Sequence, residues 1–98
     1  MVIRVFLARP RPGVADELAD LIEQVSIPFI DQQPGLLARH TGRGLGATGD
    51  EIVMISVWEN LAAMTNMTGE DWESAVIPDA RLAERIEECS VHHYESLG

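Results

Sequence analysis

Four side chains from three parts of the chain combine a base, a cation and two hydroxyl groups. The imidazole of His92 can accept the proton of a phenol as a general base. Arg4 can hold an oxyanion, while Ser56 and Tyr94 can orient a bound ring. We therefore expect these residues to act on a small aromatic molecule, if the fold brings them to one cavity.

Each of these residues also has a structural interpretation. Arg4 can pair with a glutamate near a strand end, and His92 can be a hydrogen-bonded histidine of a subunit interface. Trp58 can be dimer core rather than a catalytic group. The expected site assigns catalysis to His92, Arg4 and Trp58 and substrate binding to Phe6, Met54, Ser56 and Tyr94.

We expect neither a metal ion nor another cofactor. His92 and His93 are neighbours on a predicted strand and so point to opposite faces, and no carboxylate stands beside them at ligand spacing. The segment Gly44 to Gly49 reads G-x-G-x-x-G, but a strand rather than a helix follows it. We interpret that segment as a hairpin loop and not as a dinucleotide site.

The elements that must position these residues are organised around residues 51–60. This apolar run is typical of a strand buried on both faces. One face is purely aliphatic, with Val53, Ile55 and Val57, and we expect it to lie under helices. The other face carries Ile52, Met54, Ser56 and Trp58, and we expect it to form the wall of a cavity.

The remaining pattern predicts one α+β domain over residues 1–98. Strands are expected at residues 2–9, 36–43 and 89–95, beside the central one. A first helix is expected from Val14 to about Gln33, with a kink or end at Pro28. A second is expected from Leu61 to about Thr68, after an Asn60 cap. A short last helix is expected from Pro78 and includes Ile86. The order is that of a ferredoxin-like β-α-β-β-α-β sheet with helices on one face.

The sheet face away from the helices then needs a cover. On the face assignment above it carries large side chains that are costly to leave wet, namely Val2, Phe6, Ile52, Met54, Trp58 and Tyr94. A second copy of the chain can cover them across a two-fold axis. We therefore expect a homodimer whose sheets face each other, with the cavity between them.

Charge and apolar runs limit the other partners. The formal net charge is −9 and all seven basic residues are arginines. A negative surface argues against nucleic acids and anionic membranes. No apolar run approaches the ~18 residues that span a membrane, and the first residues lack a signal-peptide pattern. We expect a cytoplasmic protein.

The chain resembles the antibiotic biosynthesis monooxygenase-like proteins of the dimeric α+β barrel superfamily. The resemblance extends over essentially the whole chain. The residues that carry it are Val57-Trp58-Glu59-Asn60 where a strand runs into a helix, the Pro34-Gly35 turn before the second strand, and Tyr94-Glu95 closing the last strand.

This resemblance implies a dimeric barrel and a range of activities. Similar proteins include cofactor-free quinol and anthrone monooxygenases, haem-degrading enzymes and proteins with no assigned activity. Trp58 matches a tryptophan that lines the cavity in active relatives. Phe6 and Met54 stand where such relatives carry asparagine, and no histidine lies on the helix after Trp58.

Together these observations lead to two classes of function. The first is a cofactor-independent monooxygenase acting on a small aromatic, a quinol or a polyketide-like phenol, in which the deprotonated ring reacts with dioxygen directly. The alternative is a module of the same fold without catalysis, which binds a small molecule or only dimerises.

Overall fold

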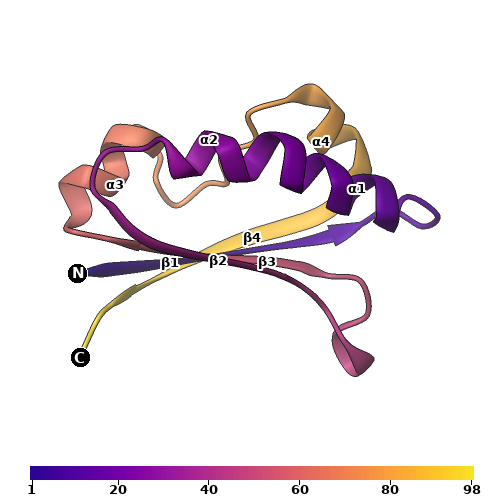
Figure 1. The fold of residues 1–98 in the computed structure, drawn as a ribbon, viewed down its shortest axis with the longest axis horizontal. Helices are drawn as coiled ribbons and strands as arrows, with labels where there is room; N and C mark the ends of the chain where they lie inside the picture. The colour runs from indigo at the N-terminus through magenta and orange to yellow at the C-terminus, as the bar shows by residue number, and fades with distance from the viewer.

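The computed structural model describes residues 1–98 and shows a four-stranded antiparallel sheet. The strands β1 (Val2–Pro10), β2 (Leu36–Arg43), β3 (Ile52–Trp58) and β4 (Ile86–Glu95) lie in the spatial order β2-β3-β1-β4. The helices α1 (Ala15–Leu21), α2 (Ile27–Asp31), α3 (Leu61–Thr68) and α4 (Ala80–Arg85) all cover one side of the sheet (Figure 1). The predicted ferredoxin-like arrangement is confirmed.

One long helical segment connects β1 to β2. A π-helical turn, Ile22–Ser26, joins α1 to α2 without a break. Leu18, Leu21 and Ile30 are buried on the side of this segment that faces the sheet. The helix does not end at Pro28 but continues through it to Asp31, and the irregularity in this segment is the π-helical turn that precedes Pro28.

The short helices begin and end at residues with a clear capping role. The side chain of Asn60 accepts a hydrogen bond from the Ala63 amide at 2.8 Å, and Gly69 follows α3 with φ +80°, so both predicted ends are confirmed. The helix predicted from Pro78 begins at Ala80 after an Asp79 cap. Ile86 is the first residue of β4 and not part of that helix.

The Pro34-Gly35 turn needs its glycine because the chain passes close to α3. Gly35 has φ +83°, and a Cβ atom there would lie 2.5 Å from the Cβ of Ala63. The Gly35 carbonyl also accepts a hydrogen bond from the Glu59 amide at 3.0 Å. The turn therefore joins β2 to the end of β3.

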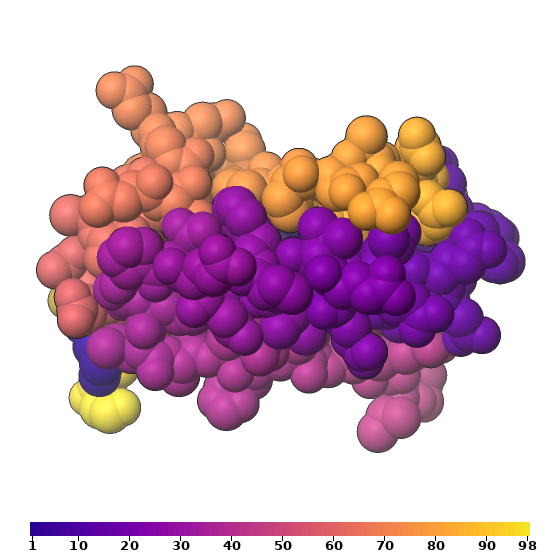
Figure 2. Space-filling model, turned by 45° about the horizontal axis from the view of Figure 1, so that its top comes forward, coloured from indigo at the N-terminus to yellow at the C-terminus, as the bar shows by residue number.

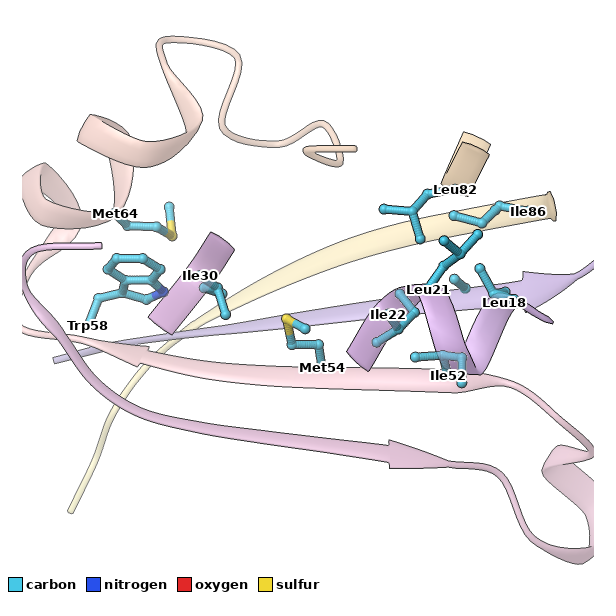
Figure 3. Packing of buried hydrophobic residues seen from close by; sticks show 11 residues of the cluster. Leu18, Leu21, Ile22, Ile30, Ile52, Met54, Trp58, Met64, Leu82 and Ile86 are labelled. Carbon is cyan, nitrogen blue, oxygen red and sulfur yellow. The ribbon is translucent and has the colours of Figure 1, made fainter. Parts of the chain in front are cut away.

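The two faces of β3 are assigned in the opposite way to the prediction. Ile52, Met54, Ser56 and Trp58 are buried, and Figure 3 shows the first two and Trp58 rising from β3 towards the helices. The aliphatic face of Val53, Ile55 and Val57 is left uncovered and half-buried. Alternation along a strand tells which residues share a face, but both faces here are apolar enough to be the inner one.

The uncovered face is a continuous aliphatic surface across the two central strands. Its side chains pair in register as Ile3 with Val57, Val5 with Ile55, and Leu7 with Val53. On the other side, α1 contacts α4, and the α1–α2 segment lies against residues 70–85 over the sheet (Figure 2).

None of the helices combines the length and the apolar character needed to cross a membrane.

Candidate functional site

A single polar row crosses the helix-facing side of the sheet. Strand register places Ser56 opposite Arg4 and Arg4 opposite His93, and Arg39 lies beyond Ser56 on β2. The neighbouring positions on the central strands are apolar, with Val2 opposite Trp58 and Phe6 opposite Met54. The polar groups are therefore concentrated at one level of an otherwise apolar layer.

Arg4 is the buried charge of this row, with only 4% of its surface exposed. Its Nη1 donates to the backbone carbonyl of Trp72 at 2.6 Å and lies 2.7 Å from Nε2 of His93. Its Nη2 donates to the carbonyl of Ser74 at 3.0 Å. The guanidinium thus joins β1 to β4 and to the irregular segment of residues 69–79, which connects α3 to α4.

No carboxylate neutralises Arg4, although the chain has 16 acidic residues. The ion pairs of this protein involve other arginines, namely Arg9, Arg39, Arg43, Arg81 and Arg85. Burial lowers the pKa of the Arg4 guanidinium, but such a group keeps its charge at neutral pH. A guanidinium has five N–H groups, and three of those of Arg4 have partners in the protein. The other two remain available to a ligand.

His93 supports Arg4 as a neutral acceptor. Burial lowers the pKa of His93, and the charge of Arg4 lowers that pKa further. The neutral ring can accept the Arg4 hydrogen bond through the Nε2 lone pair, which an imidazolium could not do. The ring also meets Trp72 edge to face, with centroids 4.8 Å apart and planes at 87°.

Ser56 contributes a second donor beside Arg4. Its hydroxyl accepts a hydrogen bond from Nε1 of Trp58 at 3.0 Å, and both residues are buried. The Ser56 O–H itself donates to no protein acceptor. The hydroxyl hydrogen is therefore left to donate to a ligand.

A cavity of ≈ 50 Å³ lies between the sheet and the helices at this position. Its 14 lining residues include 10 hydrophobic ones and only three with polar side chains, Arg4, Ser26 and Ser56. The remainder are Phe6, Ile22, Phe29, Ile30, Met54, Met67, Val76, Ile77, Pro78, Leu82 and Ile86. The cavity is thus an apolar space with one cation and two hydroxyl groups.

A second, open hollow of ≈ 410 Å³ lies at the end of the sheet beyond this cavity. His93 and Trp72 line this outer hollow, whereas Arg4, which contacts both, lines the inner cavity. Val76, Ile77 and Pro78 from the same connecting segment line the inner cavity. Residues 69–79 therefore form part of the wall between the inside and the outside.

Four residues of the predicted site meet at the cavity, and three do not. Arg4, Phe6, Met54 and Ser56 all line it. Trp58 is fully buried in the core, near Met64 in Figure 3. It does not line the cavity, but it donates a hydrogen bond to Ser56, which does. The expectation that His92 and Tyr94 share the cavity is wrong, since they pair with Val5 and Ile3 on the uncovered face.

One reversed assumption explains these differences. The cavity was expected on the sheet face away from the helices, whereas it lies under the helices within one chain. On β4, Val91 lies opposite Phe6 and so shares this helix-facing side. His93, which shares a face with Val91, therefore joins Arg4 in place of His92. Ser26 was also missed; it lines the cavity from the helical segment.

The structure also places two polar residues of β2. Arg39 lies on the helix-facing side and is neutralised by Asp31, with contacts of 2.6 and 3.2 Å. His40 is opposite Ile55 and so lies on the uncovered face. Neither residue lines the cavity.

Solved structures share the fold over nearly the full chain. SnoaB, a cofactor-independent oxygenase from Streptomyces nogalater solved as a variant, is 15% identical, with 99% of this chain and 93% of that chain covered and a TM-score of 0.74. Rv0793 from Mycobacterium tuberculosis is 18% identical, with 99% of this chain and 95% of that chain covered and a TM-score of 0.72. A variant of MhuD, solved with two manganese protoporphyrin IX molecules bound per active site, is 15% identical. The match covers 99% of this chain and 95% of that chain, with a TM-score of 0.71. At these identities the likenesses show the fold alone.

Comparison by sequence places the chain in a family. No curated protein matches it at a significant level. The family model described as antibiotic biosynthesis monooxygenase matches residues 1–74, which run from β1 through α3 and include Arg4, Ser56 and Trp58. Since that match covers most of the sequence, this protein belongs to the antibiotic biosynthesis monooxygenase family.

Proposed function

We propose that the cavity binds a small phenolic ring as its phenolate and that the protein oxidises this ring with dioxygen, as a cofactor-independent monooxygenase. The observation that carries the proposal is Arg4, a buried cation without a carboxylate partner at the wall of an apolar cavity. A charge in this position costs several kcal/mol unless something offsets it, and an anionic ligand would do so. Membership of the family and the fold shared with the oxygenase SnoaB support this proposal.

The donors of the cavity suit a single oxyanion. The free N–H groups of Arg4 and the O–H of Ser56 lie on neighbouring strands at the same level. Fixed donors in an apolar site stabilise a developing or full negative charge more strongly than water does. No carboxylate or imidazole lines the cavity, so the phenol must lose its proton to solvent on binding rather than to a local base. His92 has no part in this mechanism, because it lies on the other face.

The reaction balances without an external reductant. The phenolate donates electrons to dioxygen. One oxygen atom enters the ring, and the other leaves as water, whose two hydrogens come from the substrate, counting the proton that it released on binding. For hydroquinone the products are hydroxybenzoquinone and water, so that the substrate supplies all of the electrons. The apolar lining, which includes Phe6 and Phe29, would keep bulk water from the reactive ring.

Phenol itself tests the first step, since its ionised form is distinguished by ultraviolet difference spectroscopy. We expect wild-type protein to lower the pH at which bound phenol ionises, and Arg4→Met to abolish this effect. Arg39→Met is the matched control, because Arg39 is on the same row but is neutralised by Asp31 outside the cavity. An equal loss in both variants, or none in Arg4→Met, would contradict the proposal.

Oxygen consumption tests the second step. With hydroquinone as substrate, we expect Arg4→Met to reduce the enzyme-dependent rate by about 10²- to 10³-fold, the usual effect of removing one oxyanion donor. Binding of phenols without oxygen uptake would favour the alternative of a non-catalytic binding module.

A further inference from the structure

Ser26 places a hydroxyl on the wall of the cavity opposite Arg4 and Ser56. It is the last residue of the π-helical turn, it is half-buried, and it lines the cavity from the helical side. Arg4 and Ser56 line the same cavity from the sheet. The cavity is therefore polar on two opposing walls and apolar elsewhere.

The backbone hydrogen bonding around Ser26 is that of the π-helical turn. A serine within a helix commonly donates to the carbonyl four residues earlier, which here belongs to Ile22. The Ile22 carbonyl accepts the amide of Ile27, five residues later, and the Ser26 hydroxyl makes no hydrogen bond within the protein. Ser26 lines the cavity, so its hydroxyl is available to a ligand there.

We propose that Ser26 is a specificity-determining residue that hydrogen-bonds a second oxygen of the ring, so that the protein selects dihydroxylated rings over simple phenols. This rests on the proposed function, in which Arg4 and Ser56 hold the first oxygen as its oxyanion. A second oxygen elsewhere would meet only apolar side chains and would be buried without a partner. A second oxygen also makes the ring a better electron donor to dioxygen, which is what the reaction requires.

The test compares phenol with the three dihydroxybenzene isomers catechol, resorcinol and hydroquinone by calorimetry without oxygen, so that binding is separated from turnover. We expect at least one isomer to bind wild-type protein about tenfold more tightly than phenol, the typical effect of one hydrogen bond. Ser26→Ala should remove this preference and leave phenol affinity unchanged. Alanine favours helix, so this variant should fold, and a circular dichroism melt checks it.

Ser56→Ala is the matched variant, since it makes the same chemical change on the opposite wall. It should weaken phenol and the dihydroxybenzenes by the same factor. If Ser26→Ala keeps the preference for the dihydroxylated ring, or weakens all four ligands equally, the role of Ser26 is overturned while the phenolate site stands. If wild-type protein binds none of the four, the proposed function falls with it.

Discussion

At the scale of single residues, the most informative feature is Arg4, because buried charges in proteins are usually paired and this one has no carboxylate partner. A chain with a net charge of −9 has carboxylates to spare, and five of its arginines use them. The one arginine that is buried has backbone carbonyls and a neutral histidine instead. Departures of this kind are expected where function, rather than stability, decides the residue.

The pairing of Arg4 with a neutral His93 predicts a pH dependence of stability. The pKa of His93 is lowered in the folded state, by burial first and by Arg4 second. Below the ordinary histidine pKa of 6.5 the unfolded chain therefore binds a proton that the folded protein does not. The contribution of the neutral His93 to the free energy of unfolding should be fully present above that pH. It should decrease as the pH falls towards the folded-state pKa, by at most about 1.4 kcal/mol per pH unit.

Urea unfolding at a series of pH values from about 7 to about 5 measures this contribution. His93→Gln, which keeps an acceptor for Arg4 but cannot titrate, should show a smaller loss than wild type. His92→Gln is the control, because His92 is exposed on the opposite face of the same strand. Identical pH profiles for wild type and His93→Gln would show that His93 is not held neutral.

At the scale of elements, the connection between α3 and α4 is held to the sheet by polar contacts of its backbone. Residues 69–79 have no regular structure, yet they form part of the cavity wall and bind Arg4 through the Trp72 and Ser74 carbonyls. An aromatic ring fills or exceeds a space of ≈ 50 Å³, so we expect this segment to move when a ligand enters.

Amide hydrogen exchange tests whether Arg4 holds this segment. Arg4→Met, which keeps the length of the side chain but no donors, should raise exchange in residues 70–79 and leave β1 and β3 protected. Arg39→Met again serves as control, since its guanidinium contacts Asp31 and Thr41 instead. Unchanged exchange in Arg4→Met would mean that apolar packing of Val76 and Ile77 alone keeps the segment closed.

At the scale of the whole molecule, the uncovered sheet face is the surface that still needs an explanation. Ile3, Val5 and Leu7 with Val53, Ile55 and Val57 form three aliphatic cross-strand pairs. An exposed patch of this kind on a strongly acidic chain marks an interaction surface. We propose that a second copy covers it across a two-fold axis, through the sheet face away from the helices as expected, but with these aliphatic side chains in place of most of those predicted there.

Sedimentation equilibrium tests the dimer. Wild-type protein should have the mass of two chains, and Ile55→Glu should be a folded monomer, because it places a charge at the centre of each contacting face. Leu45→Glu is the matched control: Leu45 is 88% exposed and lies in the loop between β2 and β3. A wild-type monomer at high concentration, or an Ile55→Glu dimer, would rule this interface out.

The sequence by itself determined the type and order of the main elements and which residues share a face within one strand. Those properties depend on local periodicity and on caps such as Asn60. Only the tertiary structure decided which face of the sheet the helices cover, and with it that His93 rather than His92 meets Arg4. It also brought the carbonyls of Trp72 and Ser74 to Arg4, about seventy residues away in the chain, and the Ser26 hydroxyl to the cavity. Alternation is symmetric with respect to the two faces, and contacts over such separations leave no periodic trace in the sequence.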